Sequence, residues 1–429
     1  MSGQNNLGEE IDAFLSSKSE NVWKKVEEAT KSALNLNAKE ASKSISNSKI
    51  YTIFSSFFPG LQPELQNLIL NFFESLHEQE IVFTKFQDDS LKSLISCAKT
   101  NDDVLSANCL RVLALALNSR KDFSNQLMEE LESDLPYFFH RKIAEDCVVA
   151  ATRVLAAVIA ILPLNKLEWI ETPFLYCLQH VSEKILCAAF DAAVKYTAKG
   201  CDAISKFIQE GYLEMVYCQL RFPSVKIKLN LFKVFTNIAL CCQKHRHTLR
   251  QHDIIERLPA YICHYDDDVC MQAINFLDAM QFSQKEMIER KYVVTLILHV
   301  SMSPIAFKNR CFDMLRNIFV KCNDKEVIEL VDSGFIRPFC SMLAESDTDR
   351  AREILELLLQ VVENYNGLEH KLCRFDFDHA HNSDNKSCVD QIHAVLSRSD
   401  AELVRLASRL LDHLKAKDIK MHAPTENAE

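Results

Sequence analysis

An apolar segment recurs along this chain about every forty residues, and no other feature restricts the fold as strongly. When one anchor residue is taken from each copy, successive anchors lie 38 to 43 residues apart, with a last gap of 52. The anchors are Phe72, Leu113, Leu155, Val194, Phe235, Leu277, Leu315, Leu358 and Leu410. A repeat of this length in a helical chain is typical of a solenoid, because one unit cannot bury its own apolar face and must stack on the next. The sequence therefore predicts a long concave surface suited to binding rather than one enclosed pocket.

Composition narrows the function classes. The 429 residues include only 7 Gly and 10 Pro, which leaves little room for a glycine-rich phosphate loop. With 59 acidic and 49 basic residues the net charge is −10, which disfavours nucleic acid and favours basic partners. The motifs of serine hydrolases, dinucleotide-binding enzymes, P-loop proteins and zinc proteases are missing. We therefore expect no enzyme activity and no small-molecule substrate.

Cysteine usage and the N-terminal residues bear on the cellular compartment. The 16 Cys are scattered singly, mostly within apolar helical segments, and no C-x-x-C occurs. The first residues are polar and unlike a signal peptide, and no apolar run approaches the roughly 18 residues that span a bilayer. These features predict a protein of the cytoplasm or nucleus, without a membrane segment, whose cysteines are reduced and form no disulfides.

Two groups of Cys and His were weighed as metal ligands. The first is Cys373, His379, His381 and Cys388, and the second is Cys241, Cys242, His245, His247 and His252. Neither has the usual C-x2-4-C or H-x3-5-H zinc spacing. The first is interpreted as a solvated loop and the second as a helix end whose His and Lys side chains cap carbonyls. We therefore expect no metal and no cofactor.

Residues 206–239 show the clearest unit. Apolar spacing predicts a short helix that ends at Gly211, a second helix over 213–220, a turn at Pro223 and a third helix over 227–238. Three helices with a glycine turn is the armadillo layout, whereas a HEAT unit has two helices. We predict an elongated, all-α, right-handed superhelical solenoid of about nine or ten armadillo or HEAT-like units over residues 50–415. Residues 1–49 are predicted as a helical or linker segment and 416–429 as a polar tail.

One stretch supports a more specific comparison. Residues 327–343 read V-I-E-L-V-D-S-G-F-I-R-P-F-C-S-M-L and resemble the late armadillo repeats of importin-α. A fainter similarity covers about 50–415. The resemblance implies an adaptor in nuclear import, with localisation-signal cargo and a partner of the importin-β family. In that family a Trp on the third helix of each repeat sandwiches the stems of cargo Lys and Arg, and an Asn four residues later holds the cargo backbone.

Position by position, this chain departs from that pattern. At the Trp positions it carries Asn108, Arg153, Asp191, Lys233, Asn275 and Asp313, and at the Asn positions Val112, Ala157, Lys195, Asn237, Ala279 and Asn317. Only Asn237 and Asn317 match. The peptide-groove candidates are therefore Asn108, Arg153, Asp191, Lys233, Asn237, Asn275, Asp313 and Asn317. The two Trp, Trp23 and Trp169, lie off the groove helices, and residues 1–50 lack the arginines of a basic importin-β-binding arm.

Two functions follow as alternatives. The first is a protein-binding adaptor that holds an extended peptide or partner protein in a concave groove, in the manner of importin-α. The second is an armadillo or HEAT scaffold or assembly factor unrelated to nuclear transport. For the first, we expect a basic localisation peptide to bind weakly, with residual attraction at Asp313 and Asn317.

Overall fold

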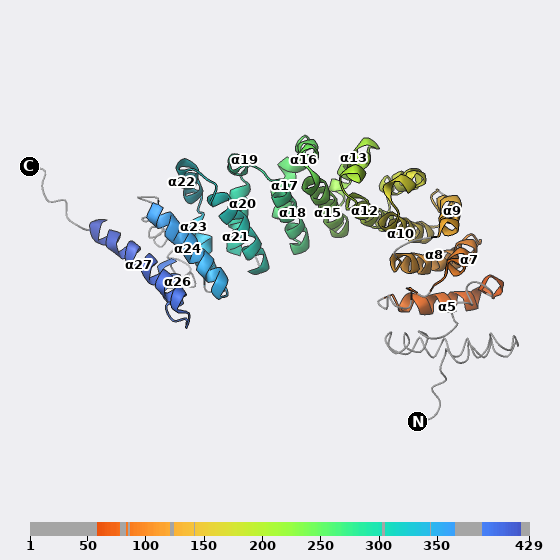
Figure 1. Cartoon of the computed structure of the whole chain (residues 1–429), viewed down its shortest axis with the longest axis horizontal. Coiled ribbons are helices and arrows are strands. Elements are labelled where there is room, and N and C mark those ends of the chain that lie inside the picture. Colours follow the sequence, from red (N-terminus) through yellow and green to blue (C-terminus); the bar gives the residue numbers. More distant parts are fainter. Residues whose placement is uncertain are drawn as a thin grey trace, which may run out of the picture. The chain divides into compact units, whose positions relative to one another are not determined.

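The computed structural model describes residues 58–77, 83–84, 86–120, 124–140, 142–302, 305–343, 345–364 and 388–421. Over these ranges every regular element is a helix (Figure 1). The chain divides into two compact units, Met1–Arg246 and His247–Glu429, and the division falls within helix α16 (Gln243–Arg250). None of the described helices is both long and apolar enough to cross a membrane.

In its described residues, the first unit contains ten longer helices and several short 3-10 turns. They are η1 (Phe58–Gly60), α5 (Pro63–Ser75), α7 (Asp88–Ala98), α8 (Asp103–Asn118), α9 (Asn125–Asp134), η2 (Leu135–Phe138), α10 (Glu145–Ile161), η3 (Leu164–Lys166), η4 (Glu168–Ile170), α11 (Glu171–Leu178), α12 (Glu183–Thr197), α13 (Cys201–Gln209), α14 (Tyr212–Cys218), η5 (Gln219–Arg221) and α15 (Val225–Cys241), before α16 begins.

The second unit continues the pattern with three-helix repeats. Its helices are α17 (Ile254–Ile262), α18 (Asp267–Ala279), α19 (Gln284–Glu289), α20 (Tyr292–Met302), α21 (Ile305–Phe319), α22 (Asp324–Asp332), α23 (Ile336–Met342), α24 (Thr348–Asn364), α26 (Cys388–Val395) and α27 (Ala401–Met421). Helix α27 continues beyond residue 415, where the sequence predicts a polar tail.

The nine anchors fall on nine different helices, one in each copy of the repeat. All of them are buried except Val194, which is half-buried. We call the helices that carry them from α8 onward the third helices: α8, α10, α12 and α15 in the first unit, and α18, α21, α24 and α27 in the second. In the first unit each third helix packs on the next, so the apolar anchors form one continuous core.

Caps and turns fix where these helices begin. Asp102, Ser182 and Asp266 accept hydrogen bonds from backbone N–H groups in the first turns of α8, α12 and α18. Gly211 has the left-handed φ of 74° between α13 and α14, which confirms the predicted glycine turn.

Some predictions fall outside the described residues. They are the segment 1–49 and three members of the first Cys/His group, Cys373, His379 and His381.

Candidate binding face

The third helices of the first unit present one continuous face. They stack in the order α8, α10, α12, α15. Lys195 on α12 donates from Nζ to Oδ1 of Asn118 on α8, at 3.3 Å, although α10 stands between those two helices in the stack. A side chain can reach over an intervening helix only where the row curves inward. The third-helix face of this unit is therefore concave at α8, α10 and α12.

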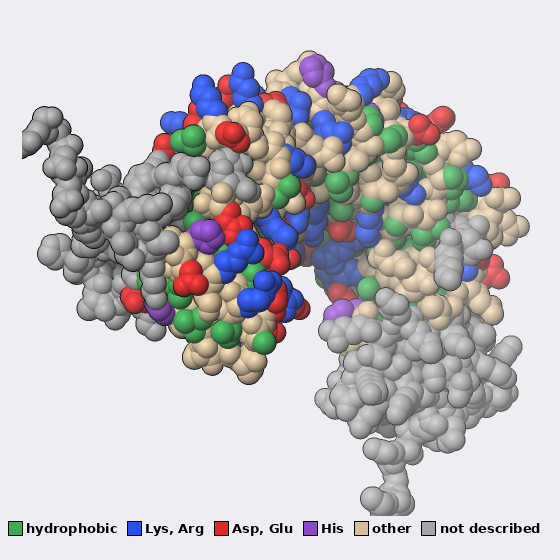
Figure 2. Space-filling view, turned by 60° about the vertical axis from the view of Figure 1, so that its left-hand side comes forward, with side chains coloured by type: hydrophobic (Ala, Val, Ile, Leu, Met, Phe, Trp, Pro, Cys, Tyr) green, Lys and Arg blue, Asp and Glu red, His purple; other side chains and the backbone are tan. Residues whose placement is uncertain are grey.

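Two predicted groove residues, Arg153 on α10 and Lys233 on α15, are exposed on this face. Neither makes a hydrogen bond or an ion pair with another residue in the described ranges. Lys226, at the start of α15, is exposed as well. Lys and Arg side chains, in blue, are prominent on the visible surface in the space-filling view (Figure 2). An acidic chain thus carries a locally basic face, which its net charge of −10 does not reveal.

The acidic candidate on this face is already paired. Asp191 forms an ion pair with Lys195, one turn further along α12, at 3.4 Å. Both side chains are at least partly exposed, so the pair is worth little in free energy and remains open to exchange with a ligand.

Asn108 holds helices together rather than facing outward. It is only 3% exposed, and its Nδ2 donates to Oδ1 of Asn67 at 2.9 Å and of Asn71 at 3.3 Å, both on α5. Its Oδ1 accepts from Arg111 at 2.8 Å. The whole amide is occupied, so the groove role predicted for Asn108 is corrected to a structural one.

Asn237 is likewise tied into a helix contact. Its Nδ2 donates to the carbonyl of Val194 at 3.2 Å and to Oγ1 of Thr197 at 3.1 Å, at the end of α12. The carbonyl of Val194 already accepts from the backbone N–H of Ala198 at 3.0 Å, so the amide of Asn237 adds a second bond that ties α12 to α15. The side chain that the resemblance assigns to a cargo backbone therefore binds this chain's own backbone.

A pocket of about 220 Å³ lies at the N-terminal ends of α8, α10 and α12. Its wall has both signs of charge: Asp103 and Arg111 come from α8, Glu145 and Asp146 from α10, and Lys184 from α12. Lys184 is 3.5 Å from Asp146, and Ser182 donates to Glu145 at 2.7 Å. Mixed charge suits a polar peptide segment better than an apolar ligand.

In the second unit the remaining candidates lie on α18 and α21, where charges neutralise one another. Asn275 is half-buried and Asn317 exposed. Asp313 pairs with Arg350 at 2.5 Å, and Arg350 also pairs with Glu353 at 2.7 Å. The side chain of Arg350 already neutralises Asp313, which opposes the residual attraction for basic cargo predicted there.

Sequence reasoning missed Lys226 and Lys184, because it followed one position in each repeat. Each lies seven residues before that position, near the start of its helix. The equivalent residues before Asn108 and Arg153 are Asn101 and Asp146, so no repeating cation in the sequence signals these lysines.

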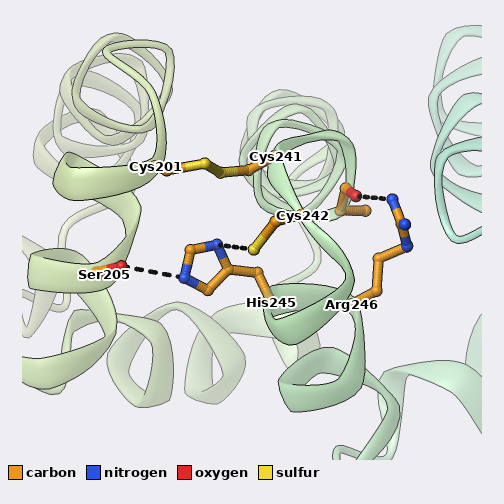
Figure 3. The surroundings of a disulfide bond; sticks show 7 residues. Cys201, Ser205, Cys241, Cys242, His245 and Arg246 are labelled. Carbon is orange, nitrogen blue, oxygen red and sulfur yellow. Dashed lines mark hydrogen bonds between the residues drawn. A yellow bond between two sulfur atoms is a disulfide. The ribbon is translucent and has the colours of Figure 1, made fainter.

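A second cluster joins two helix ends. Cys201 at the start of α13 forms a disulfide with Cys241 at the end of α15, which corrects the prediction of a disulfide-free chain (Figure 3). The two residues are one repeat apart, so stacking brings them together. Cys242 and His245 lie beside them, whereas His247 and His252 are not part of the cluster. Burial and the nearby charge of Lys244 lower the pKa of His245.

The buried thiols are poor nucleophiles. Burial raises the pKa of Cys97 and Cys270 to about 11, and that of Cys177 and Cys311 to about 12. They stay protonated at neutral pH and behave as small apolar side chains.

Comparisons with known proteins support the fold alone. No family model matches the chain, and no curated protein matches it. Among solved structures, an engineered protein has 15% identity and a TM-score of 0.63, with 96% of this chain and 99% of that chain covered. A computationally designed armadillo repeat protein for modular peptide recognition has 18% identity over 54% of this chain and 99% of that chain, with a TM-score of 0.43. A designed armadillo repeat protein in complex with the peptide (KR)4 has 16% identity over 59% of this chain and 98% of that chain, with a TM-score of 0.39. The chain has an all-α fold of armadillo-type helical repeats.

Proposed function

We propose that this protein is a non-enzymatic binding module of the cytoplasm or nucleus that holds an extended segment of a partner protein on the third-helix face of its first unit. The observation that carries the proposal is the exposure of Arg153 and Lys233 on the stacked third helices, where neither has a partner among the described residues. A ligand can therefore form ion pairs with these two cations without breaking an ion pair within the protein.

The chemistry of the face favours an acidic segment. Neighbouring helices pack roughly 8–10 Å apart, and an extended chain advances roughly 3.3 Å per residue. Arg153 and Lys233 lie two helix steps apart, on α10 and α15. Carboxylates about five or six residues apart in an extended peptide would therefore reach both cations. Asp191 lies between them and would prefer a cation or an amide at the centre of the segment.

An import adaptor for basic signals is the more specific form of the adaptor hypothesis, and residues 327–343 are its main support. A basic peptide would meet Arg153 and Lys233 on the first unit and the paired Asp313 on the second. We therefore place acidic ligands first and basic localisation signals second. A scaffold that assembles partners without nuclear transport fits the acidic ligand equally well.

The test is a fluorescence anisotropy titration of three labelled peptides, which are acidic, basic and neutral versions of one extended sequence. We expect the acidic peptide to bind the wild type most tightly. Charge reversal in Arg153→Glu/Lys233→Glu should weaken it at least about tenfold, since two exposed ion pairs near 1 kcal/mol each are inverted.

The matched control is Lys166→Glu, which reverses an exposed lysine on η3, outside the third helices. Its effect should stay within about twofold, because distant surface charges are screened at physiological salt. Equal loss in both variants would assign the effect to net charge. Tighter binding of the basic peptide would reverse our ranking in favour of the import adaptor, and no binding of any peptide would contradict the proposal.

A further inference from the structure

Three cysteines and one histidine converge where α13, α15 and α16 meet in the first unit (Figure 3). The ligand atoms of Cys201, Cys241, Cys242 and His245 all lie within 4.8 Å of one another. A tetrahedral zinc with bonds near 2.3 Å to sulfur needs its sulfurs roughly 3.8 Å apart. The sulfurs of Cys201 and Cys241 are joined in a disulfide, so this pair must be reduced and separate before it can bind the ion. Three thiolates and one imidazole form a standard structural zinc ligand set.

The fold places each ligand by a separate local feature. Cys201 is the first residue of α13 and follows Gly200, whose φ is 105°. Cys241 is the last residue of α15, and Cys242 takes an extended conformation that separates α15 from α16. His245 lies in the first turn of α16. Four ligands on three helix ends and a connecting bend are held by the same stacking that forms the core.

The hydrogen bonds of His245 fit a metal ligand. Its ring is 4% exposed, with Nδ1 3.2 Å from Sγ of Cys242 and Nε2 3.2 Å from Oγ of Ser205. Nδ1 thus faces the sulfurs, while Nε2 can donate to a hydroxyl. In zinc sites the second ring nitrogen of a ligating histidine regularly donates to an oxygen, which fixes the ring and its tautomer.

The surroundings suit the charge of the complex. Three thiolates around Zn²⁺ leave a net charge of −1. Cys201 lies at the positive N-terminal end of a nine-residue helix, which suits the negative charge of the complex. Lys244 and Arg246 flank His245 in the chain, and Nη1 of Arg246 donates to the carbonyl of Ala239 at 3.1 Å, which holds α16 against the end of α15.

We propose that this cluster is a redox-controlled zinc site. With its thiols reduced it binds one Zn²⁺ through Sγ of Cys201, Cys241 and Cys242 and Nδ1 of His245, and oxidation of Cys201 and Cys241 to their disulfide releases the metal. The inference stands apart from the proposed peptide binding. It also departs from the metal-free expectation, which overlooked Cys201 because that residue precedes Cys241 by 40 positions.

The steps balance with named reagents. A phosphine reductant and one water convert the disulfide to two thiols and the phosphine oxide. Binding of Zn²⁺ then displaces three protons, one from each thiol. Hydrogen peroxide, as the two-electron oxidant, reverses the change: the zinc complex, one peroxide and three protons yield the disulfide, one thiol, free Zn²⁺ and two waters. The remaining thiol and imidazole are too few to retain the ion.

The experiment uses the full chain, reduced with a phosphine, loaded with Zn²⁺ and desalted. Elemental analysis should find one zinc per chain, and Co²⁺ in its place should give the visible bands of a tetrahedral thiolate site. Added peroxide should release the zinc to a colorimetric chelator as Cys201–Cys241 forms, detected by peptide mass mapping.

Cys242→Ser tests the site without removing the disulfide, and Cys218→Ser is the matched control, because Cys218 is an exposed free thiol outside the cluster. We expect Cys242→Ser to lose most of the zinc while still forming the disulfide, which also shows that it folds. Ser205→Ala should weaken zinc binding by about tenfold or more through His245. A zinc-free reduced wild type, or zinc retained equally by Cys242→Ser and Cys218→Ser, would overturn the proposal and leave a plain disulfide.

Discussion

At the scale of single residues, the third helices carry two kinds of polar side chain. The amides of Asn108 and Asn237 bond to neighbouring helices, whereas Arg153 and Lys233 are exposed and have no partner within the part of the chain that the structure describes. Repeat position alone does not separate the two kinds, because Asn108 and Lys233 occupy equivalent positions. What separates them is whether the preceding helix offers a polar partner, as α5 does with Asn67 and Asn71.

Replacement of Asn108 by Ala should therefore destabilise the protein. Three hydrogen bonds in a buried site are lost, and since Asn71 and Arg111 can partly rehydrate, we expect a loss of about 2 kcal/mol in the free energy of unfolding. Lys233→Ala at the equivalent exposed position should stay within about 0.5 kcal/mol. Urea unfolding of both variants measures the difference, and equal values would show that the Asn108 network contributes nothing.

At the scale of elements, a left-handed turn separates the first two helices in three of the described repeats. Gly211 and Gly334 adopt left-handed φ values of 74° and 86°, and each is followed by a buried aromatic residue at the next position, Tyr212 or Phe335. Between α19 and α20 the same turn is made by Lys291, with φ of 60°, before the buried Tyr292. The left-handed φ strains any residue with a Cβ and favours glycine, so Lys291 is a strained residue at this turn.

Lys291→Gly should consequently stabilise the protein, by roughly 0.5–1 kcal/mol, because relief of strain exceeds the added freedom of the unfolded chain. Gly334→Ala should destabilise the protein by about 1 kcal/mol or more. Because nothing lies within 4 Å of the added Cβ, backbone strain alone would be responsible. Gly60→Ala, where φ is not positive and space is also open, is the control. Destabilisation by Lys291→Gly in thermal melts would contradict the argument.

Ser283 and Glu286 form a capping box at the start of α19, and this pair should make the stability of the protein depend on pH. Burial raises the pKa of Glu286, but hydrogen bonds from Ser283 and the charges of Arg250 and Arg290 outweigh it and hold the pKa below 4.5. The ionised carboxylate therefore adds stability at pH values above 4.5, and this contribution is lost as the pH falls through the lowered pKa. Glu286→Gln should cost about 0.5–1 kcal/mol at neutral pH and almost nothing in acid.

Urea unfolding at both pH values checks this, and Glu289→Gln on the same helix is the control. Glu289 is an exposed residue, 3.6 Å from Lys285, so its replacement should have little effect at either pH. A Glu286→Gln penalty that persists unchanged in acid would point to lost packing rather than lost charge.

At the scale of the whole molecule, the sequence predicts those features that repeat locally. The spacing of apolar anchors identified the stacked helices, and Gly211 identified a turn, because both depend on neighbours within one repeat. Features that join two repeats were missed. Cys201 meets Cys241, and Asn67 meets Asn108, only after stacking, and the left-handed Lys291 carries no glycine to signal it.

Because each repeat packs mainly on its neighbours, a substitution in the core should destabilise only the repeats around it. Leu155 on α10 is fully buried, and α10 packs mainly on α8 and α12. Leu155→Ala should cost about 2–5 kcal/mol through the cavity that it leaves. In a stack whose units contact only their neighbours, that cost is felt locally, because distant repeats lose none of their own contacts.

Hydrogen exchange read by mass spectrometry tests this directly. Leu155→Ala should speed amide exchange in α8, α10 and α12 and leave α24 and α27 at their wild-type rates. Leu315→Ala on α21, an equally buried anchor, should give the reciprocal pattern. Amide exchange should become faster in α20 and α21 and stay at the wild-type rate in α8. If either change accelerated exchange uniformly along the chain, the molecule would unfold as one cooperative body, and a ligand on the first unit could then stabilise every repeat.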